Sequence, residues 1–350
     1  MMSALSKVRV GVIGLGMGRT HLRNYLKSPR AEVVAVADLI EERREAAKQE
    51  FAVAKAYEHY EDLLADPEID AVSVALPNAL HAPVSIAAMK AGKHVLCEKP
   101  MAMNVAEAEE MAAVAKQTGR TFMMHFNSRF SKEAQWLKRH IDAGNLGRIY
   151  YARTGYIRQR GIPKLGGWFT NKAMSGGGPL IDLGVHQLDL TLWLMGHPKV
   201  ERVSGMTFAE LAPEIARRQG AHFDVEDLAV GIVHLEGGAC ILFETSWALN
   251  TGRKEEAFCV LYGTSAGVEL RRVAGEPRTL LVHTDEGGEV RTWAPEDLPE
   301  SETAQEHFVD SIYYGREPMA TAEHGVNVMR VLEALYASAA SGREVAAARE

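Results

Sequence analysis

Three side chains in this sequence have the types needed to move a proton: an imidazole, a carboxylate and an ammonium. Asp182 and His186 lie four residues apart, just after a Gly-rich stretch that ends at Gly178. Residues at i and i+4 share one face of a helix, so the carboxylate can hold the imidazole in one orientation for acid–base work. Lys99 precedes Pro100, which favours an extended backbone and projects the ammonium from a fixed position. These three residues form the predicted catalytic group.

Each of these residues also has an ordinary structural interpretation. Asp182 could cap a helix and His186 could pack in a core. Asp189 competes for the orienting role because it lies three residues beyond the histidine. Lys99 could simply end a strand at the surface. No metal site is predicted, because two ligands without a clear third are insufficient.

A glycine-rich turn near the start of the chain predicts dinucleotide binding. It follows a predicted strand at residues 8–13 and opens a helix, so the backbone can approach a pyrophosphate at the helix N-terminus. The third glycine comes one residue earlier than in the full Gly-x-Gly-x-x-Gly pattern, and Arg19 holds the expected place. The alternative is a tight turn without a ligand. The predicted cofactor contacts here are Gly14, Gly16, Met17 and Gly18.

An acidic residue at the end of the second predicted strand favours NAD over NADP. Asp38 lies roughly 20 residues beyond the glycine turn, the spacing at which a carboxylate accepts hydrogen bonds from the adenosine ribose. A carboxylate also repels a 2′-phosphate. Leu39 and Ile40 put no cation immediately after it, but Arg43 and Arg44 follow on the next predicted helix. The alternative is a simple N-cap of that helix.

A second loop is predicted to line the nicotinamide side of the cofactor site. It follows the predicted strand at 71–76, and open α/β sheets bind ligands at the carboxyl ends of their strands. A helix cap followed by a surface histidine explains the same residues nearly as well. The predicted contacts are Leu76, Pro77, Asn78 and His81.

Short apolar stretches alternate with helical patterns over the first part of the chain. Near-continuous apolar strands between helices indicate a parallel sheet that is covered on both faces. The predicted fold class is therefore α/β, with a doubly wound Rossmann domain at residues 1–126. Strands are expected at 8–13, 33–37, 71–76, 94–97 and 121–124, and helices near 19–26, 41–51, 60–64, 82–91 and 105–118.

The pattern changes after Phe126, which predicts a second α/β domain at residues 127–350. Strand patterns dominate residues 200–293 and predict an open, mainly antiparallel sheet whose uncovered face meets water or another subunit. The expected elements are helices near 132–143, 304–314 and 326–340, a helix through 194 that carries His186, a strand at 148–158, a Gly-rich loop at 161–178 and a hairpin of 228–235 with 239–247.

Composition excludes several classes of protein. Apolar residues make up 47% and charged residues 24% of the chain, as in ordinary globular proteins, and 350 residues favour two domains. The net charge of −7 without a basic stripe argues against a nucleic-acid partner. We expect no membrane partner, because the chain has neither a signal-peptide pattern nor an apolar run long enough to span a bilayer. Three scattered cysteines predict reduced thiols in a cytoplasmic protein.

These elements, in this order, resemble the glucose-fructose oxidoreductase/inositol dehydrogenase/MocA (Gfo/Idh/MocA) family over nearly the whole chain. The resemblance implies an N-terminal Rossmann domain, a C-terminal α/β domain whose open sheet forms a dimer or tetramer interface, and pyridine-nucleotide oxidoreduction of a secondary alcohol of a sugar or cyclitol. It rests on Gly14-Leu15-Gly16-Met17-Gly18-Arg19-Thr20-His21, Pro77-Asn78 with His81, Ala91-Gly92-Lys93-His94-Val95 before Glu98-Lys99-Pro100, and Gly176-Gly177-Gly178 before Asp182 and His186.

The resemblance also implies roles for individual residues. Lys99 matches the catalytic lysine of the family, and Asp182 with His186 matches its acid–histidine pair. Arg129 matches a position near the cofactor and substrate. Glu98, in the same triplet as Lys99, joins the predicted cofactor-binding residues.

The sequence therefore predicts NAD-dependent oxidation of a ring secondary alcohol by a homodimer or homotetramer. His186 is the candidate general base, and Lys99 would stabilise the developing alkoxide. Arg158 and Trp168 complete the predicted substrate contacts with Lys99, Asp182 and His186, although Trp168 could equally pack within its loop. Two alternatives stay open: an enzyme that keeps and recycles a bound NAD(H), and a nucleotide-binding regulator without catalysis.

Overall fold

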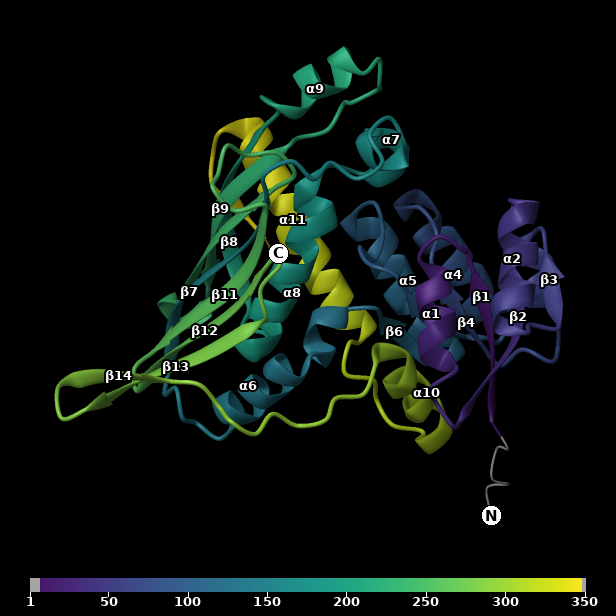
Figure 1. Ribbon diagram of the computed structural model, residues 1–350, viewed down its shortest axis with the longest axis horizontal. Helices are drawn as coiled ribbons and strands as arrows, with labels where there is room; N and C mark the ends of the chain where they lie inside the picture. Colours follow the sequence, from purple (N-terminus) through teal and green to yellow (C-terminus); the bar gives the residue numbers. More distant parts are fainter. Residues whose placement is uncertain (1–6, 348–350) are drawn as a thin grey trace. The chain divides into compact units, whose positions relative to one another are not determined.

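The computed structural model describes residues 7–347, which form two compact units (Figure 1). The first unit runs to Phe126 and also contains Glu302–Val326. The second unit covers Asn127–Ser301 and resumes at Asn327. The sequence pattern predicted a second domain over all of residues 127–350, whereas the structure places Glu302–Val326 in the first unit.

The first unit contains a sheet of six parallel strands in the order β3-β2-β1-β4-β5-β6. This order confirms the predicted Rossmann topology, in which the strand order reverses between β1 and β4. The short edge strand β3 was missed by the sequence analysis because its three residues are all half-buried and form no apolar run. The strands are β1 Val8–Ile13, β2 Ala31–Ala37, β3 Lys55–Tyr57, β4 Ala71–Val74, β5 His94–Cys97 and β6 Phe122–Met124.

The helices of the first unit begin and end at recognisable residues. Asn104 caps α5 by accepting a hydrogen bond from the Glu107 amide, and Gly119, with a φ of 63°, ends that helix. Thr303 and Glu306 form a capping box at the start of α10. The helices are α1 Gly18–Tyr25, α2 Glu41–Phe51, α3 Tyr60–Ala65, α4 His81–Lys90, α5 Val105–Thr118 and α10 Ala304–Tyr314, with the 3₁₀ turn η1 Asn78–Leu80.

Side-chain and backbone contacts explain why Glu302–Val326 belongs to the first unit. Helix α10 packs against α1, where Asn24 Nδ2 donates to Gln305 Oε1 at 3.0 Å. The Met124 amide at the end of β6 donates to Ala320 O at 2.9 Å. A Cβ atom at Gly325 would lie only 2.5 Å from Met101 Sδ. The returning segment is therefore part of the core around the sheet.

The second unit is built on a nine-stranded sheet in the order β14-β13-β12-β11-β7-β10-β9-β8-β15. Within the described part of this second sheet, only the β7–β10 pair is parallel, which confirms the mainly antiparallel prediction. The predicted hairpin is present as β9 and β10. The strands are β7 Ile149–Arg158, β8 Val200–Phe208, β9 Leu228–Leu235, β10 Cys240–Ser246, β11 Glu255–Gly263, β12 Ala266–Val273, β13 Thr279–Glu286, β14 Glu289–Trp293 and β15 Val345–Ala346.

Helices α8 and α11 cover one face of this sheet (Figure 1). The Gly-rich segment is not a plain loop as expected, because it contains η3 and α7, and the short helix α9 was not predicted. The helical elements are η2 Asn127–Phe130, α6 Lys132–Asp142, η3 Trp168–Thr170, α7 Lys172–Ser175, the π-helical turn η4 Leu180–Gly184, α8 Val185–Leu194, α9 Ala212–Arg218, η5 Glu236–Gly238 and α11 Ala322–Ser341, whose residues from Asn327 belong to this unit.

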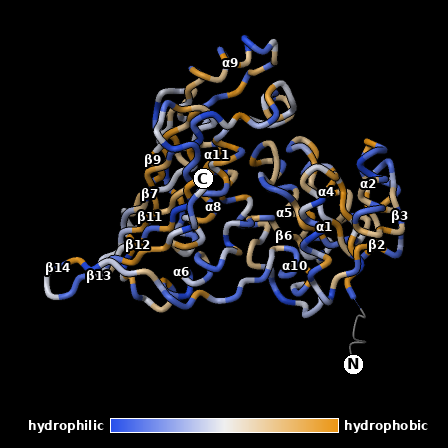
Figure 2. The backbone as a smooth tube through the Cα atoms, viewed as in Figure 1, coloured by the Kyte–Doolittle hydropathy of each residue, from blue (hydrophilic) through white to orange (hydrophobic). Residues whose placement is uncertain are grey.

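The other face of the nine-stranded sheet carries exposed apolar side chains. Successive side chains along a strand point to opposite faces of the sheet, and both hydrophobic and hydrophilic residues occur along β8 and β9 (Figure 2). Met206, Ile232 and Leu242 lie on β8, β9 and β10 and are exposed within the single chain.

Candidate functional site

The glycine turn of the first unit leaves room for a phosphate at its centre. Gly14 has a φ of +88°, and a Cβ atom there would lie 2.4 Å from Ala75 O. A Cβ atom at Gly18 would lie 2.7 Å from Val12 Cγ1, so this glycine permits close packing of α1 on β1. Gly16 has open space around its Cβ position. Bare backbone at a helix N-terminus fits the pyrophosphate of a dinucleotide.

Two neighbours of this turn are placed by the structure. Met17, at the N-cap of α1, is exposed beside the open space. Arg19 holds the place of a third glycine in the full pattern, and its guanidinium pairs with Glu50 and lies over the ring of Phe51. The arginine side chain is therefore directed to α2, and the shortened glycine pattern leaves the turn intact.

Asp38 braces the glycine turn from the end of β2. Its Oδ2 accepts a hydrogen bond from the Leu15 amide at 2.7 Å, and its Oδ1 accepts one from the Ile40 amide at 2.9 Å. Arg43 NH1 lies 3.6 Å from Oδ2, and Arg44 NH1 donates to Asp38 O at 2.6 Å. The two arginines therefore do reach Asp38, which the sequence spacing left open. Each carboxylate oxygen keeps a second lone pair for a ribose hydroxyl.

His81 is a structural residue and does not line a ligand surface as expected. Its side chain is buried at the start of α4, and its ring nitrogens lie 2.9 Å from Leu76 O and 2.6 Å from Pro100 O. Burial lowers the pKa of His81, while the two carbonyl acceptors oppose that change because each needs an N–H donor. The histidine ties the loop after β4, which includes Pro77 and the buried Asn78, to the loop after β5.

Glu98 is also buried, so its carboxylate is not available to a cofactor. Its Oε1 lies 2.9 Å from both His21 Nε2 and His125 Nδ1, and its Oε2 accepts from the Lys99 amide at 3.1 Å. Burial alone would raise the pKa of Glu98, but the contacts with His125 and His21 hold it well below its usual range. Lys99 follows β5 at the carboxyl edge of the sheet and is half-buried.

In the second unit, Asp182 and His186 stand on a helix of mixed geometry. Asp182 lies in the π-helical turn η4, and His186 lies one residue into the α-helix α8. The prediction of simple α-helical i, i+4 spacing is therefore wrong for the first turn. Asp182 Oδ2 accepts a hydrogen bond from Trp247 Nε1 at 3.0 Å, and Trp247 is fully buried. π-helical turns inside α-helices are frequent at functional sites.

Glu226 and Tyr336 hold the start of this turn and were missed by the sequence analysis. Glu226 Oε1 accepts hydrogen bonds from the Leu180 amide at 3.1 Å and from the Tyr336 hydroxyl at 2.8 Å. A Cβ atom at Gly178 would lie 2.0 Å from Glu226 O, so only glycine fits there. Glu226 and Tyr336 lie far from Asp182 in the sequence, and no spacing pattern connects them.

Two arginines on either side of Tyr156 form the charged part of the second unit's site. Arg158 and Arg272 each place their guanidinium 5.1 Å from the ring centroid of Tyr156. Both arginines pair with Glu255, at 2.8 Å and 2.9 Å. Burial lowers the pKa of Arg158, but the nearby phenol and carboxylates, including Asp182, raise it above its usual value. The predicted substrate residue Arg158 is therefore held rigidly beside the core.

Trp168 opens η3 in the Gly-rich segment. Its ring stacks on Phe169 at a centroid distance of 3.8 Å, and Phe169 packs against the hydrophobic cluster that contains Tyr156 and Trp247. The side chain of Trp168 is half-buried. The structure thus gives Trp168 the loop-packing role and leaves part of its ring accessible.

Arg129 is not a ligand-facing residue as the resemblance implied. Its side chain is fully buried in η2, and its Nε and NH2 groups donate to the two oxygens of Asp189 at 2.9 and 2.6 Å. Burial raises the pKa of Asp189, and Arg129 opposes that change. Both oxygens of Asp189 are therefore bound by Arg129 in a bidentate contact.

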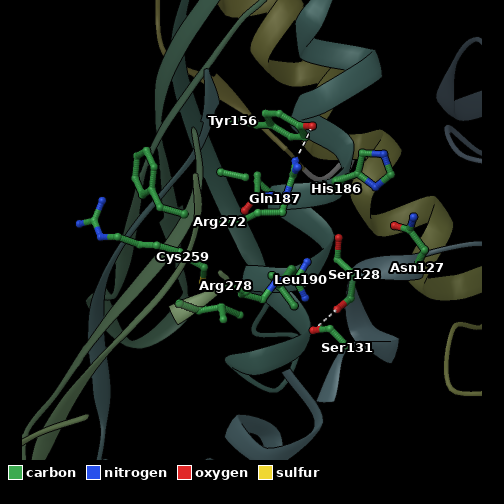
Figure 3. A pocket seen from close by; sticks show the side chains of 14 residues that line it. Asn127, Ser128, Ser131, Tyr156, His186, Gln187, Leu190, Cys259, Arg272 and Arg278 are labelled. Carbon is green, nitrogen blue, oxygen red and sulfur yellow. Dashed lines mark hydrogen bonds between the residues drawn. The ribbon is translucent and has the colours of Figure 1, made fainter. Parts of the chain in front are cut away.

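A cavity of about 230 Å³ opens beside His186 within the second unit (Figure 3). In Figure 3 His186 projects from α8 next to Asn127 of η2. Arginine and serine side chains give the cavity a polar lining that can donate hydrogen bonds to hydroxyl groups. The residues around it include Asn127, Ser128, Ser131, Tyr156, His186, Gln187, Cys259, Arg272 and Arg278.

Both units match descriptions of one protein family. Residues 8–126 match the oxidoreductase family with the NAD-binding Rossmann fold, and residues 138–347 match the C-terminal α/β domain of the same family. The fold and the matches define an oxidoreductase with a dinucleotide-binding domain. The chain belongs to the Gfo/Idh/MocA family.

Relatives and solved structures agree with this assignment. The chain is 31% identical to D-glucoside 3-dehydrogenase of Escherichia coli over 352 residues, which cover 97% of each chain. The structure of aldose-aldose oxidoreductase from Caulobacter crescentus in complex with glycerol is similar, with a TM-score of 0.83, 27% identity and coverage of 97% of this chain and 99% of that one. GenD2 from gentamicin A biosynthesis, in complex with NAD, has a TM-score of 0.81, 27% identity and coverage of 98% and 97%.

No helix within residues 7–347 combines the length and the hydrophobicity that a bilayer-spanning segment needs.

Proposed function

We propose that this chain oxidises a ring secondary alcohol of a sugar, a sugar derivative or a cyclitol, with NAD as the hydride acceptor. The observation that carries the proposal is the joint presence of Lys99 at a strand end of the Rossmann unit and His186 beside a polar cavity in the second unit. Relatives that act on glucosides and a similar structure that binds glycerol support a polyhydroxylated substrate.

The proposed chemistry moves one proton and one hydride. The imidazole of His186 takes the proton from the substrate hydroxyl, and the Lys99 ammonium donates a hydrogen bond to the same oxygen and stabilises the alkoxide. Asp182, fixed by the Trp247 indole, accepts a hydrogen bond from a neighbouring hydroxyl. NAD, when bound, supplies the acceptor for the hydride from the substrate carbon, and the products are a ketone, NADH and a proton.

The cofactor preference rests on Asp38. Its carboxylate stands at the end of β2 with free lone pairs for a ribose diol, and its negative charge disfavours a 2′-phosphate. Arg43 and Arg44 partly offset that charge. We therefore propose NAD as the main cofactor and NADP as a weaker one.

The open face of the nine-stranded sheet supports a homodimer or homotetramer. Met206, Ile232 and Leu242 form an apolar row on neighbouring strands, and burying such a row against a second copy is favourable. The unpaired cysteines, of which Cys97 and Cys259 are buried, are consistent with the reducing cytoplasm.

The test is reduced-nicotinamide absorbance, measured with NAD and NADP in parallel across inositols, aldoses, amino sugars and glycosides. We expect NADH formation with one substrate group and a loss of at least a hundredfold in kcat for His186→Ala. In the same assay, Asp38→Ala should raise the KM for NAD more than the KM for NADP, so that the preference for NAD becomes smaller. An active His186→Ala variant would contradict the assignment of the general base.

Two other functions remain alternatives that the same assay separates. An enzyme with a bound, recycling NAD(H) converts one sugar to another without releasing NADH, which product analysis detects. A nucleotide-binding regulator binds NAD and converts nothing. The presence of Lys99, Asp182 and His186 together favours catalysis over regulation.

A further inference from the structure

Glu98 is the junction of a buried hydrogen-bonded network that the proposed chemistry does not use directly. Its Oε1 contacts His21 Nε2 and His125 Nδ1, both at 2.9 Å, and its Oε2 accepts from the Lys99 amide. All three network side chains are buried. A buried carboxylate is stable only when donors satisfy it, so this network holds Glu98 in place.

The partners of His125 determine where its proton lies. His125 Nε2 is 3.0 Å from Gln305 Nε2, and Gln305 Oε1 accepts a hydrogen bond from Asn24 Nδ2. In this orientation of the Gln305 amide its nitrogen donates and His125 Nε2 accepts, while the ionised Glu98 can only accept from Nδ1. The proton of the neutral ring therefore lies on Nδ1 and points at Glu98.

A second chain of hydrogen bonds, through Tyr25 and Ser73, reaches the carboxylate by way of His21. Tyr25 OH and His21 Nδ1 lie 2.7 Å and 3.1 Å from Ser73 Oγ. When Tyr25 donates to Ser73 and Ser73 donates to His21 Nδ1, the ring proton lies on Nε2 and again points at Glu98. Burial lowers the pKa of His21, which favours this neutral ring. Every hydrogen bond in both branches is then directed toward Glu98.

We infer that His21, His125 and Gln305 are positioning residues for Lys99. The two branches keep Glu98 ionised and immobile, and the second oxygen of Glu98 fixes the amide of Lys99, so the ammonium starts from a defined backbone. Gln305 does this from the segment that returns to the first unit. The inference rests on the proposed function only in that Lys99 acts on the substrate oxygen.

The same three ligand types could hold a divalent metal ion, but that state needs the opposite proton positions. A metal would take the lone pairs of His21 Nε2 and His125 Nδ1. The His125 proton would then face Gln305 Nε2, which is itself a donor. The tautomer of His125 therefore separates a hydrogen-bonded network from a metal site.

The first experiment reads this tautomer directly, without substrate. In ¹⁵N-histidine-labelled protein we expect His125 to carry its proton on Nδ1 and His21 on Nε2, each with one resolved N–H. In Gln305→Met, which removes the amide at nearly constant length, His125 should keep its proton on Nδ1, because the Glu98 carboxylate can only accept, and the ¹⁵N shift of its Nε2 should change as that nitrogen loses its donor. A His125 proton on Nε2, or stoichiometric metal in the purified protein, would overturn the inference.

The second experiment exploits the different nitrogens that face Glu98. Glutamine places its amide nitrogen near the Nε2 position of histidine, and asparagine places it near Nδ1. We therefore expect His21→Gln and His125→Asn to keep kcat within about threefold, and His21→Asn and His125→Gln to lower it about tenfold or more, as loss of a hydrogen bond to a charged group implies. The KM for NAD should stay unchanged in all four.

The amide that preserves kcat should be glutamine at His21 but asparagine at His125. A purely space-filling role would favour the same amide at both positions. Ser311→Ala is the matched control, since it removes a buried hydroxyl of α10 that donates to His307 O and does not touch Glu98. Equal losses for both amides, or losses that follow the melting temperature alone, would overturn the inference. If the wild-type protein turns over no substrate, the proposed function fails and the ¹⁵N experiment still decides this network.

Discussion

The two candidate catalytic groups are each supported by a buried carboxylate, but the carboxylate reaches them from different places in the chain. Lys99 follows β5, and its backbone amide donates to Glu98. Glu98 in turn is held by His21 of α1 and by His125, which follows β6. His186 stands after a π-helical turn held by Glu226 and by Tyr336 of a distant helix. In the first unit, the carboxylate that binds the Lys99 amide belongs to the preceding residue, and two histidines from other segments hold it. In the second unit, the carboxylate that holds the turn before His186 itself comes from a distant segment.

This difference indicates where a substitution can change catalysis without changing the stability of the fold. The Lys99 ammonium projects from a backbone that Glu98 holds through the amide, so the side chain can be removed without loosening the network. In the second unit, charged residues such as Arg129 are themselves part of the core. We therefore expect removal of the Lys99 side chain to change turnover alone, and removal of the buried Arg129 side chain to change folding.

Removing the Lys99 side chain should have the largest effect. Lys99→Ala keeps the amide that Glu98 binds, and loss of the ammonium should lower kcat about a thousandfold, within the range for one acid–base group. NAD affinity and the melting temperature should stay unchanged. Steady-state kinetics and NAD titration check this, with the exposed Lys90→Ala as the matched control. A stable, active Lys99→Ala protein would end the catalytic assignment.

Breaking the Arg129–Asp189 pair tests the second half of the comparison. Arg129→Met leaves the Asp189 carboxylate buried without its partner, which should cost about 3 kcal/mol in the free energy of unfolding. The double variant Arg129→Met/Asp189→Leu should regain most of this loss. Urea unfolding measures both, and Arg217→Ala, which breaks an exposed pair with Glu214, should change it by less than about 1 kcal/mol. Equal effects at both pairs would contradict the role of burial.

The smallest expected effect is the contribution of His94, in the first unit, to the loss of stability at low pH. Burial holds the pKa of His94 at about 4, and its Nδ1 accepts a hydrogen bond from the Thr121 amide at 2.9 Å. The unfolded chain takes up this proton near pH 6.5 and the folded one does not, so stability is lost as the pH falls from about 6.5 to 4.

His94→Asn keeps an acceptor for the Thr121 amide and removes the titrating ring. Its loss of stability between pH 7 and pH 4, measured by urea unfolding, should be smaller than that of the wild type by about 1–2 kcal/mol. Part of the loss should remain, because burial also lowers the pKa values of His21 and His81. Identical pH profiles for the two proteins would show that the pKa of His94 is the same in the folded and unfolded chains.

Much of the first unit could be predicted because its signals are local. The glycine turn, the acid at the end of β2 and the Glu98-Lys99-Pro100 triplet are each contiguous, and alternating apolar strands and helices define the parallel sheet. The side chains of Glu98 and His81 were misjudged for a physical reason. Their types suit ligand binding, and only the fold shows that buried partners already occupy them.

The supports of the second unit's site, like the network around Glu98, could not be predicted because their contacts join distant segments. Asp182 and His186 were found from their spacing, but the π-helical turn between them has no sequence signal. Glu255 meets Arg158 through the pairing of β11 with β7, and Trp247, directly after β10, donates its indole N–H to Asp182. Arg129 was assigned by resemblance, and its bidentate contact with Asp189 follows from the packing of η2 against α8.

The return of Glu302–Val326 to the first unit has a consequence for synthesis on the ribosome. The parallel strands of that unit are made early, but α10 and its Gln305 emerge only after the whole nine-stranded sheet apart from β15 has been translated. Domains commonly fold as their chain emerges. Here the nascent first unit must wait, with its α1 surface uncovered and His125 without its amide partner, until residues 302–326 have been translated.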